Sequence, residues 1–469
     1  MFMNKKSILK NFSYTFIANM VSLLVSLLLI IFVPKFIGVK EYGYWQLYVF
    51  YTTYVSYMSF GISDGFYLRH GGREYDELDK ESLSFQYWFM VIYNVILDIA
   101  FVLTYMTLFT DANKLYIIIS VCVVGVMVVP KSLIAYSLQG SNRIKEFAIM
   151  LIIEKMLYFI LVVLLLVSGK VDFQYYIIAD IIGKLVSVIY GIFKTSDFVF
   201  YKFKMSRKNW FELVSNFKVG ILMLISNLSS LLIVGIVRMF IEKKWGIEEF
   251  GKVSLTLSIT NMMMVFVSAI SVVLFPILRK LNVDQIKKIY AVLRDIITIP
   301  LLGAMLFYFP FKSVLVAYLP AYKVSVEYMA LILPIIVFES KSMMLIVTYL
   351  KTLREEKALL VINVFMAILS LVSTITLTNY FHSIELMIVL ITVLLMIRCL
   401  LLEVYLSKVI SCSIVYNNFL ILLVSIIFIY SSYFIKGYKG FFIFLITYSI
   451  YLVINRKNIN SAWKFIKHK

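Results

Sequence analysis

Charge, cysteine and histidine are all scarce in this chain of 469 residues, and each scarcity excludes a class of function. Charged residues make up 15% of the sequence, against about 25% in an ordinary soluble domain. The three cysteines, Cys122, Cys399 and Cys412, lack the close spacing of a zinc or disulfide framework. The three histidines, His70, His382 and His468, all lie in expected loops or the tail and form no recognisable catalytic arrangement, and no glycine-rich phosphate-binding motif occurs. We therefore expect neither an enzyme nor a bound cofactor or metal.

Long apolar runs dominate instead. Hydrophobic residues make up 62% of the chain, and the mean hydropathy is +0.93. Runs near the ~20 residues that a membrane helix needs recur fourteen times. The sequence therefore predicts an all-α, polytopic membrane protein. We place its helices near residues 13–33, 44–61, 85–109, 115–138, 148–168, 174–193, 219–241, 253–275, 289–309, 327–350, 358–378, 384–406, 415–435 and 439–455.

The basic excess sets the expected orientation. A net charge of +19 could indicate nucleic acid, but the basic residues are scattered over short loops and form no aromatic-interleaved groove. Loops on the N-terminal side hold about 28 Lys and Arg and the opposite loops about 11, with Arg294 counted among the former. The positive-inside rule then puts both termini in the cytoplasm. The start of the chain lacks a small-residue cleavage site, so we expect an uncleaved first helix.

A short repeat suggests two similar halves. The motif from Gly38 to Gly43, after the first apolar run, returns from Gly246 to Gly251 after the seventh. Six crossings separate the copies, so the repeats are parallel. Glycine permits a tight turn between helices, which makes these four glycines turn or gating candidates. We expect a six-helix bundle in residues 1–200, a pseudo-symmetric second bundle in 201–410, and two further helices with a basic tail in 411–469.

Charged side chains inside the apolar segments are the informative residues. Each costs roughly 2.5 to 3.5 kcal/mol at the centre of a membrane helix, so it must pair, face the interior or reach an interface. Asp180 and Lys184 stand four apart with the acid first, which favours a helical ion pair. Arg238 and Lys155 lie near helix ends, where long side chains reach toward phosphates. The other members of this set are Asp98, Lys131, Glu154, Glu339, Lys341, Arg398 and Glu403.

Two deep lysines stand beside prolines. Lys131 directly follows Pro130, and Lys341 follows Pro334 by less than two turns. Proline removes a backbone donor and bends a helix, which membranes tolerate beside a cavity or another helix. Charge beside a bend in each half is what a mobile gate over a hydrophilic cavity requires, so both prolines are gating candidates.

These charges suggest roles in transport. Lys and Arg bind phosphate and pyrophosphate by charge and multiple donors, so a cationic cavity indicates an anionic substrate. An interior carboxylate could bind H⁺ or Na⁺ and couple transport to an ion gradient, or belong to a plain structural ion pair. The substrate-binding candidates are Lys131, Arg238, Lys341 and Arg398. The ion-coupling candidates are Asp98, Glu339 and Asp180.

Several motifs together resemble one family. They are Pro34-x3-Gly38-x3-Tyr42-Gly43-x-Trp45, Phe60-Gly61-Ile62-Ser63-Asp64-Gly65 with Arg69, Leu138-Gln139-Gly140-Ser141-Asn142-Arg143 with Phe147, and Gly246-x4-Gly251 with Ser254, Ser258, Asn261 and Phe275-Pro276. In order and spacing the chain resembles the polysaccharide transporters, or Wzx-type oligosaccharide-lipid flippases, of the multidrug/oligosaccharidyl-lipid/polysaccharide exporter superfamily. The resemblance covers most of the chain.

The resemblance implies a fold and a substrate. The fold is the MATE-like one: two six-helix bundles plus two C-terminal helices, with a central cavity and alternating access. The implied cargo is an undecaprenyl-pyrophosphate-linked oligosaccharide, an O-antigen or capsule repeat unit, moved to the outer leaflet alongside polymerase and glycosyltransferase partners. The first helix has only Asn19 as a notable polar group. It lacks the basic residues of the lipid II flippases, which argues against lipid II as cargo.

Two other functions remain open. A drug or cation exporter of the same superfamily would share the fold but line its cavity with acidic residues. A membrane polysaccharide polymerase or ligase would need a sizeable outer loop, whereas the expected outer loops are shorter than roughly 15 residues.

Overall fold

The computed structural model describes the backbone of residues 5–108, 111–278, 283–412, 414–435, 437–456 and 458–459. Side chains are described over the same ranges except at 5–12, 108, 263 and 265–288. Within these ranges every regular element is a helix, as the apolar runs predict. The chain separates into two compact units, Met1–Leu228 and Ser229–Lys469. The finer division at residues 200 and 410 stays a prediction.

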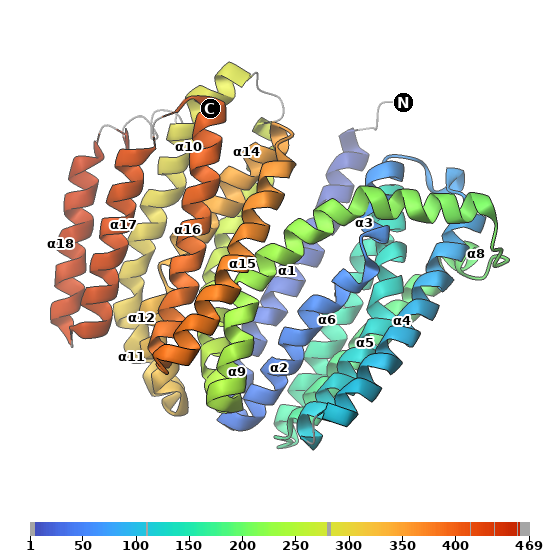
Figure 1. Ribbon diagram of the computed structural model, residues 1–469, viewed down its shortest axis with the longest axis horizontal. Helices are drawn as coiled ribbons and strands as arrows, with labels where there is room; N and C mark the ends of the chain where they lie inside the picture. Colours follow the sequence, from blue (N-terminus) through green and yellow to red (C-terminus); the bar gives the residue numbers. More distant parts are fainter. Residues whose placement is uncertain are drawn as a thin grey trace. The chain divides into compact units, whose positions relative to one another are not determined.

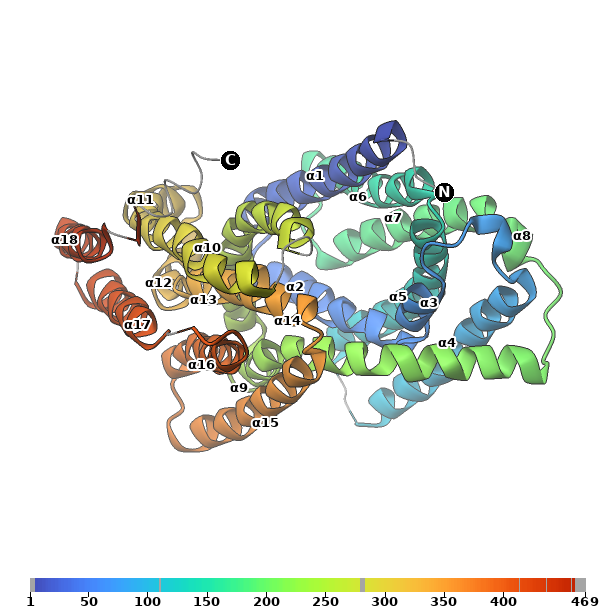
Figure 2. The same ribbon diagram turned by 90° about the horizontal axis from the view of Figure 1, so that it is seen from above.

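The first unit holds eight helices and the beginning of a ninth, within the described residues. They are α1 (Lys5–Phe36), α2 (Val39–Val55), α3 (Ile62–His70), α4 (Lys80–Leu108), α5 (Ala112–Gly140), α6 (Ile144–Val167), α7 (Phe173–Lys194), α8 (Ser196–Val199) and the first part of α9 (Arg207–Leu278). Helices α4 and α5 lie side by side, as do α6 and α7, and α1 packs along α6 (Figures 1 and 2).

The second unit holds the rest of α9 and the helices that follow it. They are α10 (Val283–Ala304), α11 (Tyr308–Tyr318), α12 (Lys323–Ile332), α13 (Ile335–Ser340), α14 (Val347–Thr352), α15 (Glu356–Tyr380), α16 (Ile384–Ile410), α17 (Val415–Ile429) and α18 (Tyr438–Ile454). A π-helix, Lys341–Ile346, joins α13 to α14, and a second one, Tyr430–Phe434, extends α17.

The fourteen predicted segments are each helical over most of their described length. Ten described helices are long and apolar enough to cross a membrane, or eleven if the bent pair Pro320–Ile332 and Ile335–Thr352 counts as one span. The numbers differ because α9 runs through two predicted segments and because α2 and α18 have only 17 residues each. The chain is thus a multi-pass membrane protein.

Both copies of the glycine motif mark a break between helices. Gly38 stands between α1 and α2 with φ −58°, an angle open to any residue. Gly246 interrupts α9 with φ 85°, in the left-handed region that favours glycine. Gly43 and Gly251 lie inside the helices that follow the breaks, not in the turns. Of these four glycines, only Gly246 therefore adopts a backbone conformation that favours glycine.

The glutamate of each copy ties its break to a later helix of the same unit. Glu41 accepts a hydrogen bond of 3.0 Å from the backbone N–H of Phe173, the first residue of α7. Glu249 accepts one of 2.6 Å from Lys252 and one of 3.3 Å from the hydroxyl of Tyr328 in α12. An acid at a helix N-terminus also meets the positive end of the helix dipole, which favours the first contact.

Close backbone contact fixes α3 against the start of α9. A Cβ built on Gly65 would lie 1.8 Å from the backbone oxygen of Asn216, and one on Gly220 would lie 1.9 Å from that of Gly61. Arg69, at the end of α3, donates to Glu212 at 2.7 Å and to the Asn216 side chain at 2.6 Å. The second family-like motif, Phe60 to Gly65 with Arg69, therefore docks α9 in this structure.

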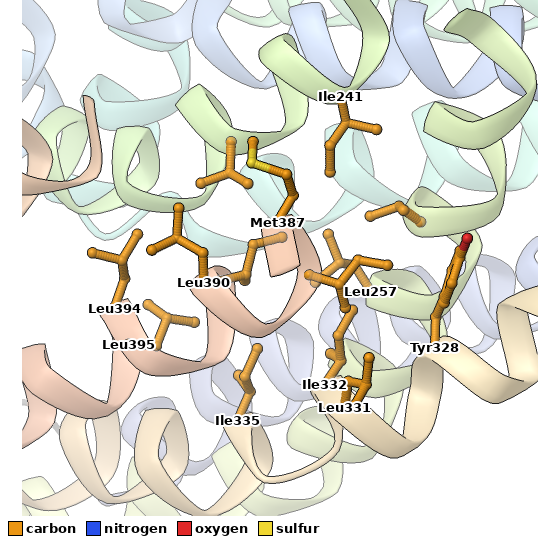
Figure 3. Packing of buried hydrophobic residues seen from close by; sticks show 14 of the residues in the cluster. Ile241, Leu257, Tyr328, Leu331, Ile332, Ile335, Met387, Leu390, Leu394 and Leu395 are labelled. Atoms are coloured by element: carbon orange, nitrogen blue, oxygen red, sulfur yellow. The ribbon is translucent and has the colours of Figure 1, made fainter. Parts of the chain in front are cut away.

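An aliphatic cluster forms the core of the second unit (Figure 3). In Figure 3, Ile241 and Leu257 of α9 point toward Met387 of α16, and Leu331 and Ile332 of α12 lie below them. Together with Gly246, which breaks α9 between Ile241 and Leu257, this packing folds the two arms of α9 around one core. Burial of such side chains holds these helices together once the chain is in the membrane.

Candidate functional site

A buried ion pair occupies the interior of the second unit. The Lys341 ammonium lies 2.5 Å from a carboxylate oxygen of Glu403 in α16, and the two side chains are 1% and 0% exposed. Lys341 also donates to the side-chain oxygen of Asn418 at 2.6 Å, and the Tyr290 hydroxyl donates to Glu403 at 2.8 Å. Extra hydrogen bonds of this kind offset the cost of removing both charges from water.

A second ion pair lies on the same helix. Arg398 of α16 donates from one guanidinium nitrogen to both carboxylate oxygens of Glu339, at 3.0 and 3.1 Å. Its Nε donates to the Asn363 side chain at 2.9 Å. Arg398 is 2% exposed, whereas Glu339 is 16% exposed. The structure thus joins a predicted substrate-binding residue to a predicted ion-coupling residue, with the carboxylate as the more accessible partner.

Irregular backbone carries the partners Glu339 and Lys341. The helix axes on the two sides of Pro334 differ by 52°. Glu339 then falls at the end of α13 and Lys341 at the first residue of the π-helix. Proline frees a carbonyl and a π-bulge rotates the side chains that follow it, and π-bulges often lie at functional sites. The expected bend beside charge is confirmed in this half.

The first unit holds its own charge cluster. Lys131 is 7% exposed and forms an ion pair with Glu154 of α6. Lys155 lies 3.5 Å from the other oxygen of the same carboxylate. Pro130 sits inside α5, which continues without interruption to Gly140. One buried acid is therefore shared between two lysines.

The predicted pair of Asp180 and Lys184 forms one turn apart on α7. The Tyr48 hydroxyl of α2 also donates to Asp180 at 2.6 Å. Asp180 therefore has both a cation and a hydroxyl, as expected of a satisfied structural ion pair, while its role in ion coupling stays a prediction.

The remaining candidates are Arg238 and Asp98. Arg238 donates to the Ser254 hydroxyl at 2.8 Å and stacks over the Phe250 ring at 5.0 Å. Asp98 is 7% exposed in α4, and one of its carboxylate oxygens is buried without a hydrogen-bond partner among the described atoms. Its carboxylate faces Gly125 of α5, where an added Cβ would lie 3.2 Å away. Glu154, Asp180, Glu339 and Glu403 each pair with a Lys or Arg, whereas within the described residues no ion pair forms at Asp98.

Sequence reasoning missed or misplaced several partners. Arg294, counted in a loop, is 4% exposed inside α10 beside Asp295, whose carboxylate lies 3.1 Å away. The loop count erred because adjacent opposite charges look solvated in sequence, whereas here they neutralise each other. The polar neighbours Tyr48, Tyr290, Asn363 and Asn418 gave no signal beyond a polar residue in an apolar run.

The four candidate cations therefore each have a partner within their own unit. Lys341 and Arg398 contact acids of their own unit, and so does Lys131. Within the described residues, no group of three or more His, Cys, Asp and Glu side chains could hold a metal ion. Within each cluster, the chemistry that these side chains offer is the forming and breaking of ion pairs and hydrogen bonds.

Comparisons with known proteins place this fold. No family model matches the chain, and no curated protein sequence matches it. An inward-facing multidrug resistance MATE family transporter of the MOP superfamily has a TM-score of 0.65 at 14% identity, covering 84% of this chain and 98% of that one. The lipid II flippase MurJ, in an inward closed conformation, has a TM-score of 0.65 at 12% identity, covering 96% and 100%. A MATE structure in the straight conformation has a TM-score of 0.56 at 15% identity, covering 87% and 96%.

These likenesses establish the fold. The chain has the helical fold of the MATE and MurJ structures, which confirms the expected MATE-like architecture. The identities are too low for the likeness to carry substrate or mechanism from those proteins to this one.

Proposed function

We propose that this chain is a flippase that moves an undecaprenyl-pyrophosphate-linked oligosaccharide, such as an O-antigen or capsule repeat unit, from the inner to the outer leaflet of a bacterial cytoplasmic membrane. The likeness to MurJ over 96% of this chain and 100% of that one carries the proposal, since MurJ is a lipid II flippase. The family-like motifs and the interior Lys and Arg support a Wzx-type cargo with a pyrophosphate.

Ion-pair exchange is the proposed mechanism of recognition. In the described structure Arg398 is held by Glu339, which is partly exposed. A pyrophosphate offers several acceptor oxygens and more negative charge than a carboxylate, so it competes with Glu339 for the guanidinium. Release of Glu339 beside the bend at Pro334 would link cargo binding to a change of conformation. Lys131, Arg238 and Lys341 are the further candidates for this contact.

The coupling ion and the setting belong to the same proposal. H⁺ or Na⁺ would drive the cycle through Asp98, Glu339 or Asp180, with no other cofactor. Both termini would face the cytoplasm. Glycosyltransferases would act before translocation and a polymerase after it.

Proteoliposomes test the proposal directly. Reconstituted protein should move a fluorescent polyprenyl-pyrophosphate oligosaccharide between leaflets, and an imposed pH gradient should change the rate if H⁺ is coupled. Arg398→Gln should slow translocation more than Arg398→Lys, which keeps the charge but loses the fork. Equal rates with and without the protein would overturn the proposal.

An ion-coupled multidrug exporter is the second candidate. The MATE likeness and the unpaired carboxylate oxygen of Asp98 favour it. Cells that express the chain would then expel a fluorescent organic cation, and Asp98→Asn would abolish that efflux while leaving membrane insertion unchanged.

A further inference from the structure

The segment that connects α8 to α9 carries an unusual surface. Residues 200–211, here called the connecting segment, comprise the link after α8 and the first five residues of α9, and they are rich in exposed apolar and basic side chains. The exposed apolar members are Phe200, Tyr201, Phe203, Met205, Trp210 and Phe211. The exposed basic members are Lys202, Lys204, Arg207 and Lys208.

Contacts with α4 hold this segment in place. The Trp88 indole donates to the backbone oxygen of Val199 at 2.8 Å, and the Ser84 hydroxyl donates to that of Tyr201 at 3.0 Å. The Trp210 ring lies 5.6 Å from an α4 phenylalanine ring, in an edge-to-face arrangement. Figure 2 shows the loop after α8 running to the start of α9 beside α4. The surface is therefore ordered before any ligand arrives, which lowers the entropy cost of binding.

The acids Asp79, Asp197 and Glu212 near the connecting segment each have a cationic partner. Asp79 lies 2.6 Å from Lys208, Asp197 lies 2.8 Å from Lys80, and Glu212 binds Arg69. Burial tends to raise the pKa of the Asp79 carboxyl, but the hydrogen bond and charge of Lys208 outweigh it and hold that pKa below its usual range. These acids are engaged by other cations, and within the described residues no ion pair forms at Lys202, Lys204 or Arg207.

We propose that the connecting segment binds anionic phospholipid head groups of the leaflet beside it. Aromatic rings settle at the membrane interface, and Lys and Arg next to them are attracted to anionic lipid. A soluble acidic partner would need only the cations for binding and would leave the apolar side chains in water. The exposed rings and Met205 also need an apolar medium, which the acyl region under the head groups supplies. The proposal holds whatever cargo the protein carries.

Brominated lipids test this binding on the full chain. The protein is reconstituted in a mixture of phosphatidylglycerol and phosphatidylcholine. In one sample the phosphatidylglycerol is brominated, in the other the phosphatidylcholine is brominated, and the bromine content is equal in both. The quenching assigned to Trp210 is the difference between the wild type and Trp210→Phe. We expect stronger quenching from brominated phosphatidylglycerol, falling toward equality as salt screens the charges.

Two triple variants separate lipid binding from total charge. Lys202→Gln with Lys204→Gln and Arg207→Gln should lose the preference for phosphatidylglycerol, by about fivefold for each cation removed. The matched control replaces the exposed Lys170, Lys243 and Lys323 by Gln and should keep the preference. Equal quenching by the two lipids in the wild type, or the same loss in both triple variants, would overturn the proposal.

Discussion

At the scale of single residues, the interior of this protein is governed by neutralisation. Buried charge in a bilayer is tolerated only when an opposite charge and enough hydrogen bonds accompany it. The pair of Lys341 and Glu403 meets that condition with both side chains fully buried. In the pair of Arg398 and Glu339, the carboxylate is partly exposed. Full burial therefore marks Lys341 as a stability residue and partial exposure marks the Arg398 pair as the better site for exchange.

Removing one partner of the fully buried pair should be more harmful than removing both. We expect Glu403→Gln to destabilise the protein by about 3 to 5 kcal/mol, because the ammonium of Lys341 remains buried without its carboxylate. The double variant Lys341→Met with Glu403→Leu should regain most of that loss. Thermal melting in detergent measures both.

The control for this pair is Lys155, whose side chain is 32% exposed and lies 3.5 Å from Glu154. Lys155→Met should change the melting temperature little, since exposed pairs contribute about 0 to 1 kcal/mol. A double variant at Lys341 and Glu403 that melts as low as Glu403→Gln would contradict this account.

Asp98 should carry a proton in the resting protein. A buried carboxylate oxygen without a partner is far less costly to bury when the group is neutral. We therefore expect dicyclohexylcarbodiimide, which attacks protonated carboxyls in apolar surroundings, to label Asp98, as read by peptide mass spectrometry. Glu339, held by Arg398, should stay unlabelled, and Asp98→Asn should remove the label. Labelling of Glu339 in preference to Asp98 would reverse the assignment.

At the scale of elements, the two copies of the glycine motif differ in whether their first residue must be glycine. Gly246→Ala places a side chain at φ 85°, so we expect a loss of about 1 kcal/mol or more. Gly38→Ala, at φ −58° with no atom within 4 Å of the added Cβ, should be close to neutral. Melting temperatures compare the two; equal losses would mean that the break in α9 is not set by its backbone.

The docking of α9 on α3 gives a second prediction about elements. Gly65→Ala would put a Cβ 1.8 Å from the Asn216 backbone, and because backbone cannot yield as a flexible side chain can, α3 and α9 must separate. Hydrogen exchange in residues 207–220 should then rise. Gly38→Ala serves again as the control and should leave that exchange unchanged.

At the scale of the whole molecule, orientation is the property that charge counting predicts and side labelling can measure. In a variant without Cys412, a cysteine at Lys202 should react with an impermeant thiol reagent only from the cytoplasmic side. A cysteine at Lys170 should react only from the opposite side. The positive-inside rule requires this difference; labelling of both from one face would mean that the number of crossings between them is not odd.

Local spacing made part of the site predictable. The pair of Asp180 and Lys184 follows from four residues of helix, and the bend at Pro334 follows from proline chemistry. The partners of Arg398 and Lys341 lie 59 and 62 residues away along the chain, so no helical period links them. Arg294 was misplaced for the same reason, since its burial depends on helices that pack against α10.

The sequence by itself determined that the chain crosses the membrane many times, where its long apolar helical segments lie, and that the charges inside must be compensated. Apolar length and the cost of bare charge in lipid are properties of short segments. The tertiary structure alone decided which charge compensates which. It also decided that Gly61, Gly65 and Gly220 form one backbone contact, and that the acids near the connecting segment pair with Arg69 and Lys208. Those outcomes depend on which helices pack together, and packing is settled by the shapes of distant surfaces.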